Sequence, residues 1–300
     1  MIPSWLPASL PSPPEHTWYL GVVPVRAYAV ALLAGIVVAA WVTMSRWRAR
    51  GGDPWDVVNL AFWMVPFGIV GARVHHVLSL PGTYFGPGAD PLAALRVWEG
   101  GLSFWGALAF GALGAWIGCR TRGLRLSSFA DALAPGLFLG QAVGRLGSWF
   151  NQELYGPPTD LPWAVEIARE HLVTNPATGV AYPEGTTFHP TFAYEILWYL
   201  AAAGVLLFLD RRFKFGHGRV FWAYVVLYTL GRVWIEMMRI DETEILLGLR
   251  LNVWTSVVLG LVALAVSAVL ARRFPQREES VEREPGPATT GPVPETMRRA

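Results

Sequence analysis

The 300-residue sequence has few charged residues, a single cysteine and a single lysine. Charged residues make up 15% of the chain and hydrophobic residues 53%, with a mean hydropathy of +0.36, a balance that argues against a soluble protein. The one cysteine, Cys119, excludes an internal disulfide and any metal cluster built from cysteines. The net charge of +2 gives no support to a nucleic-acid partner or to a strongly acidic one.

Several common catalytic motifs are also missing. The sequence contains no P-loop, no HExxH, no GxSxG and no acidic cluster suited to a metal ion. Nucleotide use, zinc proteolysis and serine hydrolysis therefore lack motif support, and we expect neither a metal nor a cofactor.

Long hydrophobic segments are abundant instead. A helix needs about 20 apolar residues to cross about 30 Å of hydrocarbon. Seven segments are close to this length: 25–44, 57–79, 102–119, 127–149, 190–209, 219–238 and 252–270. We predict an all-α polytopic membrane protein with about seven transmembrane helices.

Positive residues are distributed unevenly between alternate loops. One side receives thirteen, namely Arg46, Arg48, Arg50, Arg120, Arg122, Arg125, Arg211, Arg212, Lys214, Arg219, Arg272, Arg273 and Arg277. The other side receives four, namely Arg96, Arg169, Arg239 and Arg250. Because cytoplasmic loops are enriched in Lys and Arg, this asymmetry predicts an N-terminus outside and a C-terminus in the cytoplasm.

The chain divides into three parts on these grounds. Residues 1–21 have no basic n-region and no cleavage site, so we expect an external N-terminal segment rather than a removable signal peptide. Residues 22–271 form the seven-helix transmembrane domain that carries the function. Residues 272–300 are rich in charge and proline, which predicts a disordered cytoplasmic tail. The long outer loops, 80–101 and 150–189, suggest that the function lies on the outer face.

Four further arginines, Arg26, Arg73, Arg145 and Arg232, fall inside the predicted spans. An arginine at the centre of a bilayer costs about 2.5–3.5 kcal/mol on insertion scales, so each is expected to be paired, solvated or functional. Arg26 stands at a helix start and can equally snorkel to the surface. Arg145 has no acidic residue three or four positions away, which makes a bound phosphate the more economical partner.

Two polar patterns accompany these arginines. Tyr228, Arg232 and Glu236 are spaced by four residues and share one helix face, although the Arg232–Glu236 pair can also be purely structural. The segment GRLGSWFNQELYG, residues 144–156, places glycines beside Arg145, which suits a bound anion.

This segment resembles the signature of bacterial prolipoprotein diacylglyceryl transferases, GRxGNFxNxExxG. The shared positions are Gly144, Arg145, Gly147, Phe150, Asn151, Glu153 and Gly156. Further agreement comes in order from Tyr28, WEGGLSFWG at 98–106, HPTFAYE at 189–195 and YTLGRVWIEMMR at 228–239. The resemblance covers about residues 20–270, and seven spans with an external N-terminus are also what that family has.

The resemblance implies transfer of the diacylglyceryl group of phosphatidylglycerol to the lipobox cysteine thiol of a preprolipoprotein, with release of glycerol phosphate. It implies a multi-pass protein of the bacterial plasma membrane, the inner membrane where there are two, whose active site faces the outer leaflet. The partners are phosphatidylglycerol, preprolipoprotein signal peptides and membrane lipid, with no nucleic acid. Arg145 and Arg232 match the family's two essential arginines. Other sensitive family positions match Tyr28, Asn151, Gly156, Tyr228 and Glu236.

Two positions depart from the family pattern. Trp105 stands where the family commonly has a histidine proposed as a general base, and Ser148 where it commonly has asparagine. An indole has only a donor N–H and cannot accept a proton. Either that histidine is not the base in general, or another residue serves here.

The residues indicate how such a reaction would be carried out. We expect Arg145 and Arg232 to clamp the lipid phosphate, Tyr28, Asn151 and Tyr228 to orient the headgroup, and Glu236 to hold Arg232. Arg73, Glu153, Gly156, His189, Trp105 and Ser148 complete the candidate substrate-binding set. The proton acceptor stays open among His189, Glu195 and Glu153, then His75 and His76, because a thiol with a pKa near 8.5 is already partly ionised.

Two other functions fit the same features less well. An anion channel or transporter would line a path with the arginines, but the polar groups in the spans gather on the outer side. A non-catalytic lipid-binding or assembly protein would keep the clamp without a site for a thiol.

Overall fold

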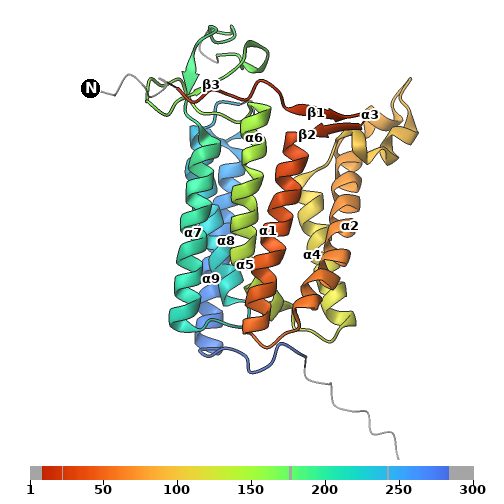
Figure 1. The fold of residues 1–300 in the computed structure, drawn as a ribbon, viewed down its shortest axis with the longest axis vertical. Helices are drawn as coiled ribbons and strands as arrows, with labels where there is room; N and C mark the ends of the chain where they lie inside the picture. The colour runs from red at the N-terminus through yellow and green to blue at the C-terminus, as the bar shows by residue number, and fades with distance from the viewer. Residues whose placement is uncertain (1–8, 22, 176–177, 242, 284–300) are drawn as a thin grey trace, which may run out of the picture. The chain divides into compact units, whose positions relative to one another are not determined.

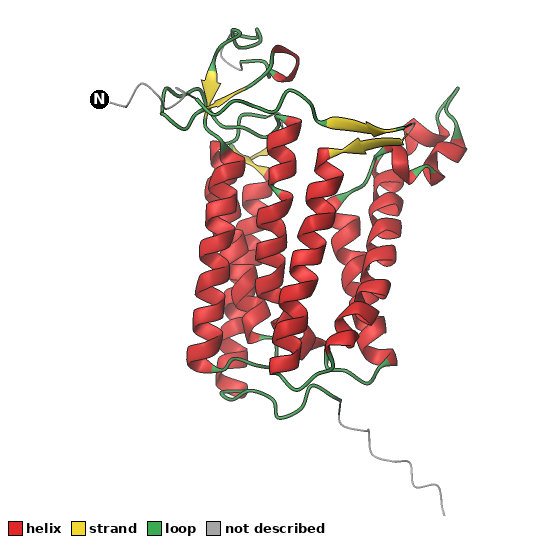
Figure 2. Ribbon diagram, in the orientation of Figure 1, coloured by secondary structure: helices red, strands yellow, loops and turns green. Residues whose placement is uncertain are grey.

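The structure is a computed structural model that describes residues 9–21, 23–175, 178–241 and 243–283. Helices dominate the described chain, and short strands are confined to its connections (Figure 2). The chain forms two compact units, one of residues 1–62 with 127–278 and one of residues 63–126 with 279–300. We call them unit 1 and unit 2 and describe each by itself.

Unit 1 is a bundle of long helices with extended connections. Its helices are α1 (Ala27–Ala49), the start of α2 (Pro54–Ser79), α5 (Leu126–Gly144), α6 (Leu146–Asn151), α7 (Thr191–Phe213), α8 (Arg219–Met238) and α9 (Leu251–Arg273). Helices α1, α5, α7, α8 and α9 run side by side, and the hairpin of strands β1 (Thr17–Leu20) and β2 (Val23–Arg26) lies at one end of them (Figure 1). We call this end of unit 1 the hairpin end.

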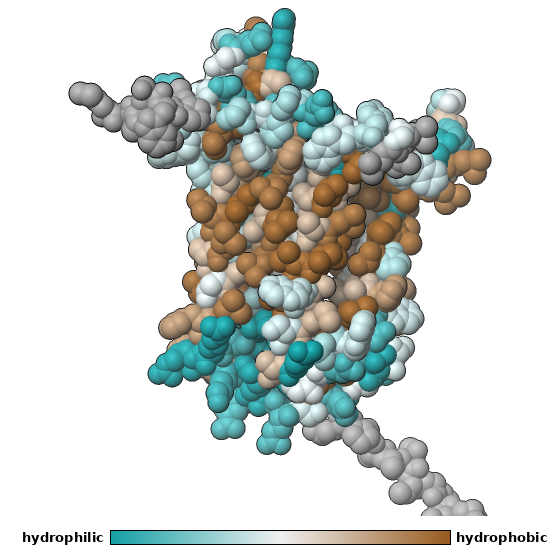
Figure 3. All heavy atoms as spheres, viewed as in Figure 1, coloured by the Kyte–Doolittle hydropathy of each residue, from teal (hydrophilic) through white to brown (hydrophobic). Residues whose placement is uncertain are grey.

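The long helices present apolar side chains on their outer surfaces. Val37 and Trp41 of α1 and Leu197 and Phe208 of α7 are exposed, and brown spheres cover the middle of these helices (Figure 3). Five helices, α1, α2, α7, α8 and α9, have the length and hydropathy of a membrane span. Exposed apolar side chains on helices of this length are expected when the solvent is lipid. The described part of the chain is therefore that of a mostly helical, multi-pass membrane protein.

Two of the seven segments predicted as spans are less apolar than the others. Helices α4 (Phe104–Thr121) and α5 contain 18 and 19 residues, long enough to approach the thickness of a bilayer. They do not reach the hydropathy of the other five, since α4 is rich in glycine and contains Arg120 and α5 contains Asp131.

Two boundaries differ from the prediction. The predicted span 127–149 is interrupted, because α5 ends at Gly144, Arg145 forms the junction, and α6 begins at Leu146. Arg26 lies outside a helix, since it ends strand β2 and immediately precedes α1. It is the N-cap of α1, which agrees with its expected position at a helix start.

Small residues allow the helices of unit 1 to approach closely. A Cβ placed on Gly140 of α5 would lie 2.6 Å from the carbonyl oxygen of Gly35 on α1, so the two backbones are nearly in contact. Phe138 of α5 packs against Tyr199 of α7 and Tyr224 of α8, with ring centroids 5.7 and 4.5 Å apart. Such close packing of small and aromatic residues is typical of helix association in lipid.

Short strands lie in the connections of unit 1. Strands β1 (Thr17–Leu20) and β2 (Val23–Arg26), β3 (Val165–Glu166) and β4 (Thr187–Phe188), and β5 (Ile245–Leu246) and β6 (Leu249–Arg250) form three antiparallel pairs. Between β3 and β4 lies the short 3-10 helix η3 (Arg169–His171). Phe188 and Tyr155 anchor the 152–190 connection in a small hydrophobic core.

Unit 2 contains most of α2, α3 (Pro81–Phe85), the 3-10 helices η1 (Pro91–Leu95) and η2 (Val97–Glu99), and α4. Helices α2 and α4 cross closely, because a Cβ on Gly106 would lie 2.6 Å from the Cβ of His75. The connection between them is held by hydrogen bonds to Arg73, described below.

The start of the predicted disordered tail is ordered. Arg277 binds Asp210 at 2.6 Å, and Glu278 accepts a hydrogen bond from the His217 N–H at 2.7 Å and lies 3.5 Å from Arg50. Burial opposes the charge of Glu278, but the hydrogen bonds that it accepts and the charge of Arg50 together lower its pKa below the usual value. The expectation of disorder is wrong for residues 272–283, and residues 284–300 lie outside the described residues.

Candidate functional site

The junction between α5 and α6 positions Arg145. Its main-chain N–H still bonds to the carbonyl of Gln141 at 3.0 Å, so α5 and α6 are nearly continuous at this residue. The Nε atom of Arg145 lies 2.8 Å from Oε2 of Glu195 on α7. The hydroxyl of Tyr199, one helical turn further along α7, also lies beside Arg145.

Arg232 reaches the same carboxylate from α8. Its Nη1 lies 3.8 Å from Oε1 of Glu195, and its Nη2 lies 2.8 Å from Oε2 of Glu236. Glu195 therefore bridges Arg145 and Arg232, which we call the arginine pair. The predicted contact between Arg232 and Glu236 forms. No acidic residue lies three or four positions from Arg145, but Glu195 of another helix pairs with it, so a phosphate is not needed to balance its charge.

The arginine pair is more exposed than the acids that hold it. Glu195 and Glu236 are 4% and 0% exposed, whereas the side chains of Arg145 and Arg232 are 22% and 18% exposed. A guanidinium carries five N–H donors, and the carboxylates of Glu195 and Glu236 occupy only some of them. The remaining donors can bind a further anion in a bidentate manner.

Glu236 is the centre of a larger network that sequence spacing does not predict. Its Oε1 accepts hydrogen bonds from Arg250 Nε at 2.8 Å and Asn252 Nδ2 at 3.1 Å, and its Oε2 lies 3.4 Å from Arg239. Arg250 ends strand β6 and Asn252 lies in the first turn of α9, whereas Arg232 lies on α8. A buried carboxylate with this many donors is held in one position and fixes Arg232 in place.

Asp241 closes this network outside the helices. It binds Arg239 at 2.8 Å and Arg250 at 3.1 Å. Burial opposes its charge, but the hydrogen bonds from Arg239 and the charges of both arginines lower the pKa of Asp241 below its usual value. The two arginines are thereby held toward Glu236.

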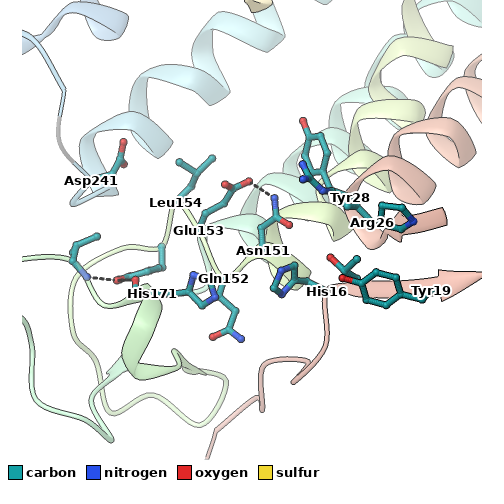
Figure 4. Close-up of a pocket in the computed structure, with 14 residues that line it drawn as sticks. His16, Tyr19, Arg26, Tyr28, Asn151, Gln152, Glu153, Leu154, His171 and Asp241 are labelled. Atoms are coloured by element: carbon teal, nitrogen blue, oxygen red, sulfur yellow. Dashed lines mark hydrogen bonds between the residues drawn. The ribbon is translucent and has the colours of Figure 1, made fainter. Parts of the chain in front are cut away.

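A cavity of about 740 Å³ opens at the hairpin end of unit 1 (Figure 4). It brings together Tyr28, Asn151 and Glu153 of the predicted site. Asn151 Nδ2 donates to Glu153 Oε1 at 3.3 Å. Tyr28 packs on Gly147, where an added Cβ would lie 2.7 Å from Tyr28 Cδ2. The glycine therefore lets Tyr28 lie directly against α6, two residues from Arg145.

Other predicted residues support the backbone at this end. Gly156 donates its N–H to the carbonyl of His189 at 2.9 Å, and a Cβ there would lie 2.9 Å from His189 Cβ. His189 Nδ1 lies 2.9 Å from the Tyr194 hydroxyl, and Ser148 is buried in α6 with its main-chain N–H bonded to the Arg145 carbonyl. Tyr228 of α8 stacks against Tyr224 with ring centroids 6.1 Å apart.

Arg73 was expected in the substrate-binding set, but the structure gives it main-chain carbonyls as partners. Its Nε donates to the Ala94 carbonyl at 2.8 Å, and its other nitrogens donate to the carbonyls of Ala93, Arg96, Gly100 and Gly101. Arg73 is 7% exposed and ties the 93–101 segment to α2. Every nitrogen of Arg73 is already engaged, so this arginine is a structural residue of unit 2.

Trp105 and the two lower-ranked histidines also belong to unit 2. Trp105 is about half exposed at the start of α4, and His75 contacts Ser79 on α2. Among the described residues, no group of three or more His, Cys, Asp or Glu side chains is arranged to hold a metal ion.

The family model of prolipoprotein diacylglyceryl transferase matches residues 15–269. The chain belongs to this family. As a member of the prolipoprotein diacylglyceryl transferases it is a transferase, and the channel or transporter interpretation is not favoured.

Individual relatives agree over most of their length. Phosphatidylglycerol–prolipoprotein diacylglyceryl transferase of Streptomyces griseus is 50% identical over 275 residues, 92% of this chain and 82% of the relative. The Paenarthrobacter aurescens protein of the same name is 53% identical over 271 residues, 88% of this chain and 84% of the relative. That of Corynebacterium efficiens is 49% identical over 282 residues, 93% and 87% of the two chains.

Proposed function

We propose that this chain transfers the diacylglyceryl group of phosphatidylglycerol to the lipobox cysteine thiol of preprolipoproteins. The observation that carries the proposal is the arginine pair, two partly exposed guanidiniums held by the bridging carboxylate of Glu195. Phosphatidylglycerol has one phosphodiester, which is an anion of the size that two such forks bind. The names of the relatives supply the lipid and the protein substrate.

The reaction is a displacement at carbon. The thiolate sulfur forms a bond to the glycerol carbon that carries the phosphate, the carbon–oxygen bond breaks, and glycerol phosphate leaves with the electron pair. Negative charge therefore grows on the departing phosphate oxygen. Arg145 and Arg232 gain interaction energy as this charge grows, which lowers the barrier and not merely the energy of binding.

The remaining residues of the proposed site act through position. Tyr28 and Asn151 offer hydrogen bonds to the headgroup from the cavity, and Tyr228 does so from α8. Glu236 fixes Arg232, with Arg250 and Asn252 behind it. Gly156 provides the close backbone approach that keeps the 152–156 turn beside the helices.

The thiol needs little help to ionise. A cysteine with a pKa near 8.5 is a few per cent thiolate at neutral pH, and two neighbouring guanidiniums lower that pKa. Glu195 is committed to the arginine pair, and Trp105 has no acceptor atom. We infer that the thiol proton passes to solvent or to an exposed group such as Glu153, without a dedicated buried base.

We place the hairpin end outside the cell. The lysines and arginines that predict the cytoplasmic side lie at the opposite ends of α1 and α7, where Arg46, Arg48, Arg211 and Arg212 occur. On this view α4 and α5 also cross the bilayer, which gives seven spans. The arginine pair then faces the outer leaflet of the bacterial plasma membrane, the inner membrane where there are two.

The experiment is incubation of the purified protein with phosphatidylglycerol vesicles and a peptide containing a lipobox cysteine. We expect a mass increase equal to one diacylglyceryl group, and its loss when the peptide cysteine is replaced by serine. Absence of the adduct under conditions in which a relative forms it would refute the proposed function.

A further inference from the structure

The cavity at the hairpin end is larger than the reaction alone requires. Its volume of about 740 Å³ lies within the range of about 300–1,000 Å³ found for sites that hold drug-sized ligands. A glycerol headgroup is far smaller. Asn151 lies six residues beyond Arg145, which at 1.5 Å per residue places the cavity about 9 Å from the arginine pair along α6.

The cavity is lined by polar side chains without a partner. Among the described residues, His16, Tyr19, Arg26 and Tyr28 make no side-chain hydrogen bond or ion pair, and all four line the cavity (Figure 4). His171 faces His16 with ring centroids 6.3 Å apart, and the hydrogen bonds that it makes among the described residues come from its main-chain N–H and carbonyl. Arg26 offers only donors, whereas the tyrosine hydroxyls and the histidine rings can both donate and accept, which suits the N–H and C=O groups of a polypeptide.

The β1–β2 hairpin offers main-chain groups as well. Thr17 pairs with Arg26, and Tyr19 with Pro24. The Ala27 N–H donates to the His16 carbonyl at 2.9 Å, which makes Thr17 and Arg26 a non-hydrogen-bonded pair. By alternation Tyr19 and Pro24 form another such pair, and a proline, which lacks the N–H, fits there.

The free edge of β1 follows from this register. In non-hydrogen-bonded pairs the N–H and C=O groups point away from the partner strand, so those of Thr17 and Tyr19 point to the open edge. Thr17 and Tyr19 line the cavity together with Arg26 and Pro24, the residues opposite them on β2, so the cavity borders the hairpin face that these four share, next to the open edge. An open strand edge with unpaired main-chain groups is a template for an added strand, which recognises peptides by backbone more than by side chain.

We propose that this cavity binds the polypeptide segment that follows the acceptor cysteine, in extended form along β1. The inference rests on the proposed function and names the part of the protein substrate that the site holds. A signal peptide keeps its apolar region in the membrane before the cysteine, so the residues after it lead outward, from the arginine pair toward the hairpin end. Glu153 and Asp241, both on the cavity wall, make it a poor second site for an anionic headgroup.

The test compares two acceptor peptides on the full-length protein in phosphatidylglycerol nanodiscs. One ends directly after the cysteine, and the other continues for four more residues. We expect the extension to lower the peptide KM about tenfold, a difference of about 1.4 kcal/mol. In Arg26→Gln and Tyr19→Pro, we expect this advantage to fall below about threefold, with kcat and the KM for phosphatidylglycerol unchanged.

The variants are chosen to leave the hairpin intact. A proline at position 19 removes an N–H that points to the open edge, and it leaves the hydrogen bonds between β1 and β2 intact. Pro24, the residue opposite Tyr19, is already a proline in the same kind of position. Arg211→Gln is the matched control, because Arg211 is an exposed arginine at the opposite end of α7. It should keep the full advantage of the longer peptide.

Three results would overturn the inference. The first is an equal KM for both peptides in the unmodified protein. The second is a rise in the KM for phosphatidylglycerol in Arg26→Gln with an unchanged peptide preference, which would assign the cavity to the headgroup. The third comes from a binding assay by fluorescence anisotropy, in which the longer peptide carries serine in place of cysteine. If Arg26→Gln and Tyr19→Pro bind this peptide with the same Kd as the unmodified protein, the inference fails. This binding assay needs no transfer, so failure of the proposed function, seen as no adduct with either peptide, is distinguishable from failure of this inference.

Discussion

Replacing Glu195 with glutamine tests whether the bridge between Arg145 and Arg232 serves the reaction or only the fold. The substitution keeps the shape of the side chain and removes the charge that lies 2.8 Å from Arg145 and 3.8 Å from Arg232. Removing one partner of a buried ion pair costs about 3–5 kcal/mol, and the glutamine carbonyl retains part of this. We therefore expect a stability loss near the lower end of that range.

The loss of kcat in Glu195→Gln should be larger than the loss of folded protein can explain. A displacement of about 1 Å in a positioning group costs about 10²-fold in rate, so we expect kcat to fall by about that factor. The KM for phosphatidylglycerol should not rise, because two guanidiniums freed from a carboxylate attract the phosphate at least as well. The assay is thioether formation on a lipobox peptide at varied lipid concentration.

Asp210→Asn provides the matched control for this experiment. Asp210 lies fifteen positions further along α7, about 22 Å away, and binds Arg46, Arg50 and Arg277 at 2.6–3.3 Å. We expect it to lower thermal stability by a similar amount and to leave kcat within about threefold of the unmodified protein. Equal losses of kcat in the two variants, or an unchanged kcat in Glu195→Gln, would refute the positioning role.

Three further variants test other parts of the structure. Gly147→Ala places a Cβ 2.7 Å from Tyr28 Cδ2 and should lower the rate of transfer at least about tenfold. In Gly144→Ala the added Cβ meets nothing within 4 Å, so the rate of transfer should stay unchanged. Transfer assays of both variants test this. Glu278→Gln should lower thermal stability at neutral pH. Because the folded pKa of Glu278 is lowered, its contribution is present above about pH 4.3 and is lost as the pH falls through the folded pKa, so melting curves of the two proteins should converge in acid. Trp105→His should change kcat/KM by less than about tenfold, about 1.4 kcal/mol, and a larger gain would show that a histidine there acts as a base.

The sequence predicted the helices and one face of the site well. Periodicity and apolar length follow from geometry within one helix, so α8 was predicted at its observed bounds, and the Arg232–Glu236 pair followed from a spacing of four residues. The motif that contains Arg145 also placed this residue correctly near the end of its helix.

The spacing of residues along the sequence could not predict the contacts between different helices. Glu195 joins Arg145 across a separation of fifty residues, and Glu236 is reached by Arg250 from strand β6 and by Asn252 from α9. Helix periodicity determines which residues share a face but leaves open which helix lies opposite. For the same reason, the sequence could not show that backbone carbonyls occupy Arg73.

The central claim is that Arg145 and Arg232 hold the lipid phosphate while its negative charge grows. The most direct test measures phosphatidylglycerol binding and thioether formation separately in Arg145→Lys and Arg232→Lys. A lysine keeps the charge but loses the planar fork, so we expect each variant to lose about 10²–10³-fold in transfer and much less in lipid binding. Turnover at the level of the unmodified protein in both variants would contradict the account.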